Sequence, residues 1–369
     1  MAIEIIQDIR RWQEIRSDWE RLAKHNAMLC FDWMFGWWQA YGAGCRLHIV
    51  VVRDAADNIV GIAPWYEHSP EGAASVRFLA SGKVCSDYLE ILAVESERAY
   101  VHQSIAQHLQ QHFGRFSSNT FAQGVYVEGM RTESPSILHF FDEIKDRGFL
   151  VRTRALGNCW RAELPKSWDQ FARGLTGYRQ KANKAIRNMA NGTIHAREIN
   201  DSRYADQGLA ILKSLHLMRR SVVGDQGCYA DSRFESFLQL AIPPMLDSGK
   251  ARFVYLETDG RPISILLLLV SDTWIAHYQS GMNPDASSLE PGHASVVQSI
   301  HQAIQDGFAD YDFLRGDEPY KKRWSAIPVT ISKAWLVPPT ICARATFLLK
   351  ENAIFWRNAC RGACSQQAT

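Results

Sequence analysis

Residues 274–324 have the sequence WIAHYQSGMNPDASSLEPGHASVVQSIHQAIQDGFADYDFLRGDEPYKKRW. Pro291 and Gly292 begin a segment in which apolar residues recur at helical spacing until Gly307. The segments on either side, 274–279 and 311–314, are short and rich in aromatic residues, which is typical of strands. A strand, a helix and a second strand in this order predict a parallel crossover and therefore an α/β fold with a mixed sheet.

The start of this helix is a candidate anion site. A helix that begins just after a strand presents free backbone N–H groups and the positive end of its dipole. Gly292, His293 and Ala294 lie at that end, where small residues allow a phosphate to approach. The other interpretation is an ordinary helix start, without ligand, in a protein that contains a sheet.

Two basic clusters precede this segment. In the predicted helix 178–191, Lys181, Lys184 and Arg187 advance along one face, which is either a solvated face or an anion-binding surface. His216 is followed by Arg219 and Arg220 at helical spacing. These three side chains are either ordinary surface groups or ligands for a carboxylate or phosphate.

Composition indicates a cytoplasmic, water-soluble protein. The 369 residues are 46% hydrophobic, enough for two cores, and 41 basic against 39 acidic residues leave a net charge of +2. This balance excludes a strong overall attraction to nucleic acid. No apolar run approaches the ~20 residues of a membrane span, and 263–269 is predicted to be a buried strand. The eight cysteines show no zinc spacing, so we expect no metal site and no disulfides.

The chain divides into two halves of similar plan. We expect a first domain over 1–155, a second over 156–340 and a helical tail over 341–369. In the second domain, helices are predicted at 168–191, 204–220 and 234–248, followed by strands at 252–257, 263–270 and 274–279.

The order of motifs resembles the GNAT acyltransferase superfamily, in particular its CelD-like branch, which is associated with cellulose and exopolysaccharide biosynthesis and is related to the Fem-type peptidyltransferases. The motifs that carry the resemblance are WQEIRSDWERL (12–22), FDWMFGWWQAYG (31–42), VGIAPWY (60–66), SDYLEIL (86–92), YRQKANKAIRNM (178–189), LHLMRR (215–220), GRPISILLLLV (260–270), EPG (290–292) and YDFLRGDEPYKKRW (311–324). The resemblance implies two GNAT-like domains in tandem with a cleft between them. It also implies an acyl-CoA donor, with Gly292, His293 and Ala294 at its pyrophosphate and Lys184 and Arg187 nearby.

The last motif supplies candidate catalytic groups for acyl transfer. Asp312 lies in an apolar strand, so its carboxylate must be paired or have a shifted pKa. If it faces the cleft, it is the general base for an amine or hydroxyl acceptor. If it is paired with Arg315 or Lys321, it is structural and Glu318 is the better candidate.

Other residues are expected to complete the site. Tyr278, Tyr320 and His277 are candidate donors to the carbonyl oxygen or to the leaving thiolate. The resemblance implies that the helix with His216, Arg219 and Arg220 borders the acceptor side. The expected substrate-binding residues for a small-molecule or saccharide acceptor are His216, Arg219, Arg220, His277, Lys321 and Trp324. No G-x-S-x-G motif occurs, so direct attack without a covalent intermediate is expected.

Two positions depart from the superfamily pattern. Acetyl-CoA binders of this type usually carry Gln or Arg where this chain has Leu289, and Glu290 would repel a phosphate at the helix start. Two alternatives therefore stay open: a Fem-type ligase that uses aminoacyl-tRNA, and a non-catalytic scaffold in polysaccharide assembly. The tail, 340–364, is expected either to dock on the second domain or to contact the membrane peripherally.

Overall fold

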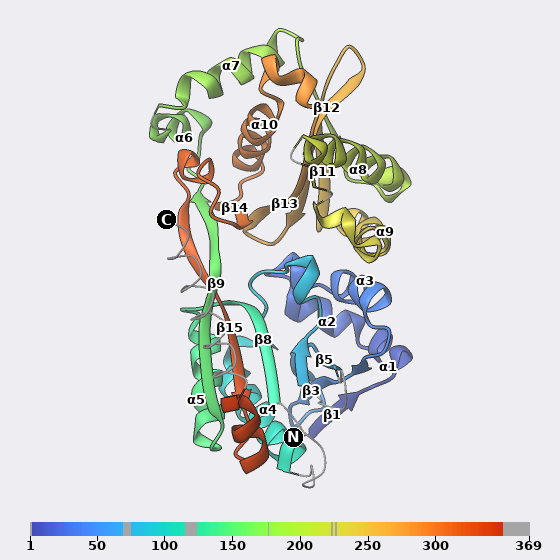
Figure 1. Cartoon of the computed structure of the whole chain (residues 1–369), viewed down its shortest axis with the longest axis vertical. Coiled ribbons are helices and arrows are strands. Elements are labelled where there is room, and N and C mark those ends of the chain that lie inside the picture. The colour runs from blue at the N-terminus through green and yellow to red at the C-terminus, as the bar shows by residue number, and fades with distance from the viewer. Residues whose placement is uncertain are drawn as a thin grey trace, which may run out of the picture.

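A pair of long antiparallel strands, β9 (Leu150–Glu163) and β15 (Ile327–Val337), runs through both halves of the molecule in the computed structural model (Figure 1). The structure describes residues 2–68, 75–114, 124–175, 177–222, 224–225 and 227–349. β9 occupies the region where the boundary at 155/156 is predicted, so the polypeptide passes between the halves as a strand. The division into domains remains a prediction.

The two strands belong to a mixed sheet of eleven strands in the order β10-β11-β12-β13-β14-β9-β15-β8-β6-β5-β2. A second sheet has the order β1-β3-β4-β7. The remaining strands are β1 (Ala2–Ile6), β2 (Arg46–Leu47), β3 (Ile49–Arg53), β4 (Ile59–Ala63), β5 (Trp65–His68), β6 (Ser75–Phe78), β7 (Leu92–Ala93), β8 (Gly124–Arg131), β10 (His195–Ile199), β11 (Ala251–Thr258), β12 (Arg261–Val270), β13 (Trp274–Met282) and β14 (Asp310–Arg315).

Helices cover these sheets in both halves. They are α1 (Ile9–Glu14), α2 (Arg16–Ala23), α3 (Phe31–Tyr41), α4 (Arg98–Gly114), α5 (Pro135–Asp146), α6 (Trp168–Gly174), α7 (Arg179–Ala190), α8 (Ala205–Ser221), α9 (Ser232–Asp247) and α10 (Pro291–Gln305). Residues 341–349 of the predicted tail are helical, and the rest of the tail lies outside the described residues. Within the described ranges, no helix combines the length and apolar character that a membrane span requires.

The crossover predicted from the sequence is confirmed. α10 begins at Pro291, and β13 and β14 on either side of it pair in parallel through Trp274–Ala276 and Asp310–Asp312. The predicted single helix over 168–191 is wrong, because α6 and α7 are separate helices. α6 is followed by Leu175, whose backbone is extended, and Gly177 with a φ of +70° lies in the turn before α7.

β12 shows why the second half has two helical layers. Its apolar residues alternate between two cores: Ile265, Leu267 and Leu269 pack in the core shared with α8 and α9, whereas Leu266 and Leu268 pack in the core that contains α7 and α10 residues. A strand that is apolar on both faces requires cover on both sides, as predicted for 263–269. In Figure 1, α10 and α7 lie on one side of β12 and β13, and α8 and α9 lie on the other.

The two halves contact each other through α3 and α9 as well as through the long strands. A Cβ added to Gly36 of α3 would lie 2.8 Å from the Cβ of Ala241 in α9, so only glycine allows the helices to approach this closely. Trp33 packs edge-on against Phe237 at this contact, with ring centroids 4.7 Å apart. A cavity of about 170 Å³ also lies at the junction, lined by His25 and Tyr88 of the first half and Arg161 and Trp274 of the second.

Candidate functional site

The parallel pairing of β13 and β14 ends at Ala276 and Asp312, and beyond this point the two strands diverge. Each strand is also irregular here: β13 has one extra residue opposite β12 between His277 and Gln279, and β14 has one extra residue opposite β9 between Asp312 and Arg315. Such bulges bend a strand and end its pairing. The divergence leaves room for a groove between the strands.

Two cavities meet at this divergence. One, of about 460 Å³, is lined by His216, Arg220, Phe313, Arg315, Glu318 and Lys321 among others. The other, of about 410 Å³, is lined by Tyr178, Glu290, Gly292, His293, Val296 and Trp324 among others. Both are lined by Arg219, His277, Ser280 and Tyr320, so the two cavities form one groove.

The second cavity lies at the start of α10, as the candidate anion site requires. Gly292 and His293 line it, whereas Ala294 is 1% exposed and packs in the core beneath. The side chain of Glu290 makes no capping hydrogen bond to this helix. Its carboxylate instead accepts a hydrogen bond from the Lys181 ammonium of α7 at 2.5 Å, which lowers the pKa of Glu290.

His293 is held in this cavity by aromatic contacts. Its ring stacks on Trp324 with centroids 5.0 Å apart and meets Tyr178 edge-on at 4.7 Å. Its Nε2 atom is buried without a hydrogen-bond partner, and burial lowers the pKa of His293 to about 4. The imidazole is therefore neutral at pH 7. Lys184 and Arg187 are exposed on α7, outside the residues that line the cavity.

At the junction of the cavities, Tyr320 and His277 face the groove. Tyr320 is 37% exposed, and burial of the rest of the side chain raises its pKa to about 12, so its hydroxyl stays protonated near neutral pH. Burial, with the nearby Lys321 ammonium, lowers the pKa of His277 to about 4. The Nδ1 atom of His277 is buried without a hydrogen-bond partner.

Glu318 and Lys321 lie on the wall of the first cavity but differ in exposure. The Glu318 side chain is 55% exposed and its Oε2 lies 2.9 Å from Lys321 Nζ. Lys321 is 2% exposed, and its ammonium donates to the carbonyl oxygens of Leu314, Arg315 and Gly316 at 3.0–3.1 Å. Lys321 therefore fixes the loop that carries Glu318.

Asp312 does not line either cavity of the groove. It is 0% exposed, accepts a hydrogen bond from the Tyr88 hydroxyl at 2.6 Å, and accepts another from the Leu314 amide at 2.7 Å. Burial raises the pKa of Asp312 to about 6. Its partner is neither Arg315 nor Lys321, because Arg315 pairs with Asp87 at 2.6 Å.

Tyr278 is also committed to the junction between the halves. Its hydroxyl donates to the Val84 carbonyl at 2.8 Å, and its ring packs edge-on against Trp33 at 4.9 Å. Burial holds the pKa of Tyr278 well above its ordinary value. The hydroxyl thus points to the first half.

α8 brings His216, Arg219 and Arg220 to the groove. A Cβ on Gly281 of β13 would lie 2.5 Å from the His216 amide nitrogen, so this glycine allows α8 to lie against the strand. His216 is buried, its Nδ1 lies 3.2 Å from the Ser280 carbonyl oxygen, and burial lowers its pKa. Arg219 and Arg220 are exposed, and Arg220 lies 3.5 Å from Asp225.

Sequence reasoning missed the residues of the first half that support this site. Asp87, Tyr88 and Val84 all contact β13, β14 or the segment after it. The motif 86–92 was noted in the sequence, but nothing in its spacing identified partners more than 200 residues away.

Part of the chain matches a known family model. Residues 176–322, which supply most of the groove's lining, match the model of the acetyltransferase (GNAT) domain. The match lies within the second half of the chain. No curated protein matches the sequence.

Solved structures share the fold over nearly the whole chain. FemX is 11% identical with a TM-score of 0.67, covering 95% of this chain and 99% of FemX. The C-terminal domain of a protein described as a lysylphosphatidylglycerol synthetase, from Agrobacterium fabrum, is 10% identical with a TM-score of 0.54, covering 94% and 97%. L-PGS from Bacillus licheniformis is 10% identical with a TM-score of 0.53, covering 93% and 96%. The chain thus has the mixed α/β fold of FemX, which agrees with the predicted fold class.

Proposed function

We propose that this protein is an acyltransferase that moves an acyl group from acyl-CoA to an amine or hydroxyl acceptor in the groove between β13 and β14. The observation that carries the proposal is the continuity of the two cavities through Arg219, His277, Ser280 and Tyr320. A donor held at the start of α10 and an acceptor beside Glu318 would meet at this junction. Bringing two reactants together in one orientation supplies a large part of such catalysis.

The donor side is supported by the open amino end of α10. Its free backbone N–H groups and its dipole favour the pyrophosphate of CoA. The pairing of Glu290 with Lys181 offsets the negative charge that would oppose this binding. The acyl carbonyl would then reach the edge of β13 where pairing with β14 has ended.

The chemical step requires one group to accept a proton and another to donate one. Glu318 accepts the proton from the acceptor amine or hydroxyl as it attacks the acyl carbon. The carbon–sulfur bond breaks, and Tyr320 donates its hydroxyl proton to the thiolate of CoA. Proton exchange with solvent at these two exposed groups restores both. His277, neutral near pH 7, accepts a hydrogen bond from the acceptor and orients it.

The acceptor side has an excess of positive charge. Arg219 and Arg220 are exposed at the first cavity, whereas Arg315 and Lys321 on its wall already pair with Asp87 and Glu318. Guanidinium groups bind carboxylates and phosphates in a fixed geometry. The acceptor we propose is therefore an acidic sugar, a polysaccharide precursor or an amino acid, in keeping with a role in exopolysaccharide biosynthesis.

A second candidate is the transfer of an aminoacyl group from tRNA. The exposed face of α7 favours it, because Lys184 and Arg187 have no carboxylate partner among the described residues. The fold shared with FemX and L-PGS does not distinguish between the two donors.

Ligand binding to the full chain separates these functions. We expect acetyl-CoA or a longer acyl-CoA to raise the melting temperature and to release or absorb heat in calorimetry, since a ligand at about 100 times its Kd stabilises by about 2.7 kcal/mol. A Lys184→Ala/Arg187→Ala variant should keep this binding. If no acyl-CoA binds and charged tRNA binds with steep salt dependence that the same variant reduces, the donor is aminoacyl-tRNA. If neither binds, the chain is a scaffold and the transferase proposal fails.

A further inference from the structure

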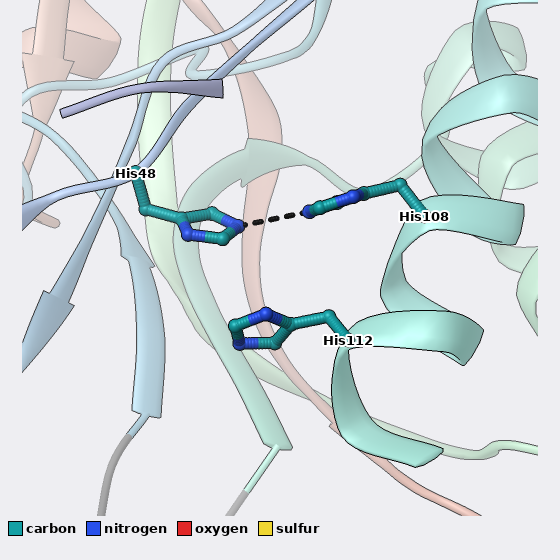
Figure 2. Close-up of side chains that lie close together, drawn as sticks. All are labelled: His48, His108 and His112. Atoms are coloured by element: carbon teal, nitrogen blue, oxygen red, sulfur yellow. Dashed lines mark hydrogen bonds between the residues drawn. The ribbon is translucent and has the colours of Figure 1, made fainter. Parts of the chain in front are cut away.

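Three histidines converge in the first half of the molecule, far from the groove. His48 lies between β2 and β3, and His108 and His112 lie one turn apart on α4 (Figures 1 and 2). The Nε2 atoms of His48 and His108 are 3.1 Å apart. One ring nitrogen from each of the three histidines lies within 4.8 Å of the others.

A buried carboxylate lies behind this cluster. Glu67 of β5 is 4% exposed, and its Oε1 atom lies 2.8 Å from His48 Nδ1 and 3.6 Å from His112 Nε2. Its Oε2 atom accepts a hydrogen bond from Arg46 Nε at 3.0 Å. A carboxylate beside His48 Nδ1 favours the proton on that atom, which leaves the lone pair of Nε2 free to point toward His108.

We propose that His48, His108 and His112 bind one divalent transition-metal cation, with zinc as the best match, and that Glu67 orients the His48 ligand. Nitrogen–zinc bonds of about 2.0–2.1 Å in a tetrahedron place two ligand nitrogens about 3.3 Å apart, close to the separation of the His48 and His108 Nε2 atoms. A carboxylate on the second nitrogen of a metal-binding histidine is the usual outer partner. Water would take the fourth position.

The position of the cluster indicates a structural role. α4 packs on β3 and β4, and the metal would join this helix to the loop between β2 and β3. Because the unfolded chain lacks the assembled site, metal binding would add to the stability of the folded first half. The donor and acceptor cavities lie in the second half, so this inference is independent of the proposed function.

The sequence indicated no metal site, because its cysteines lack zinc spacing. The i, i+4 spacing of His108 and His112 was the available signal, since it places both rings on one face of a helix. The third ligand comes from a loop sixty residues earlier in the chain and could not be paired with them without the fold.

Metal titration of the full chain without a histidine tag tests the proposal. After dialysis against a chelator, we expect one equivalent of Zn²⁺ to bind with a Kd of about 10 µM or tighter and to raise the melting temperature. His108→Gln and His112→Asn should each weaken binding at least about tenfold. His139→Gln is the matched control, because His139 is an exposed histidine on the adjacent α5 and should not affect binding.

Co²⁺ as a replacement for Zn²⁺ identifies the ligands without relying on the variants. Tetrahedral nitrogen ligation gives strong visible absorption without the near-ultraviolet charge-transfer band of a thiolate. The proposal is overturned if about 0.1 mM Zn²⁺ does not bind, if the thiolate band appears, or if His108→Gln and His112→Asn, folded by circular dichroism, bind as tightly as the unaltered chain.

Discussion

β14 and the segment that follows it carry polar groups in two different environments, one buried against the first half and one open to the groove. On the side facing the first half, Asp312 accepts from Tyr88 and Arg315 pairs with Asp87, with both carboxylates almost fully buried. On the side facing the groove, Glu318 and Tyr320 lie at accessible cavities only a few residues further along. The surroundings of these carboxylates differ: Asp87 and Asp312 are buried, whereas Glu318 is exposed.

This difference separates structural from chemical roles. A carboxylate that water cannot reach cannot exchange its proton with an acceptor in the groove, so Asp312 serves to hold the bulge of β14 through the Leu314 amide. Leu314 has a φ of +54°, a conformation that needs such support. Glu318 is exposed and lies 2.9 Å from Lys321, so it is the carboxylate that we propose for proton transfer.

Removing Arg315 should have the largest effect on stability. Arg315→Ala leaves the Asp87 carboxylate buried without its partner, and breaking a buried pair in this way costs about 3–5 kcal/mol. Urea denaturation would measure the loss. Much of the lost unfolding free energy is the penalty for the unpaired Asp87 charge. The Asp87→Asn/Arg315→Ala double variant should therefore be more stable than Arg315→Ala alone. If the double variant is no more stable than the single one, the pair is not what holds this junction.

The buried Asp312 should produce a characteristic dependence of stability on pH. Its pKa is about 6 in the folded chain against about 3.8 unfolded, so the folded state binds more protons between these values. Stability therefore falls as the pH rises from about 4 to about 6 and is constant above that range, with a total of about 3 kcal/mol for this group. In Asp312→Asn this contribution is absent.

The measurement compares the unfolding free energies of the two proteins at pH 4 and pH 7. The contributions of other titrating groups cancel in this comparison. The stability of Asp312→Asn relative to the unaltered chain should therefore increase as the pH rises. Parallel pH profiles would show that Asp312 remains ionised, and would remove the argument that burial excludes it from catalysis.

The sequence predicted the local elements of this region better than its contacts. Periodicity located α10 and the apolar run of β12, and the crossover length gave the parallel pairing of β13 and β14. β9 was not recognised, because its residues 152–158 are mostly polar or small and show no alternation. The long pairing of β9 with β15 stabilises it instead.

The candidate site was predicted as a set of residues but not as a geometry. The groove contains four of the predicted residues, Glu318, Tyr320, His277 and Trp324. All four belong to the crossover strands or to the segment directly after β14. Asp312 lines neither cavity, and Tyr278 lines the first cavity but directs its hydroxyl to the first half. The partners that hold these two side chains are more than 190 residues away. Strand alternation alone cannot identify which face is covered by another part of the chain.

Glu318 should be required for turnover and not for folding. Glu318→Gln keeps the shape of the side chain but cannot accept a proton, so we expect kcat to fall on the order of 10²-fold, equivalent to about 2.7 kcal/mol in the barrier. Donor binding and melting temperature should be unchanged, because the side chain is exposed. Steady-state kinetics with the donor found by calorimetry would measure this, with Asp317→Asn as an exposed neighbouring control. An equal loss in both variants would show a general effect of charge on the loop.

The smallest effect is expected at the start of α10, where Glu290 sets the charge seen by the donor. Glu290→Gln removes a negative charge beside the helix end, so an anionic donor should bind about two- to fivefold more tightly at low salt. Lys181→Met should act in the opposite direction, because it leaves the Glu290 carboxylate without its partner. Calorimetry with acyl-CoA at two salt concentrations would measure the affinity change in each variant. Both affinity changes should be smaller at the higher salt concentration. If the two variants change affinity in the same direction, the phosphates do not lie at this helix end, and the donor must enter the groove from the cavity lined by Glu318.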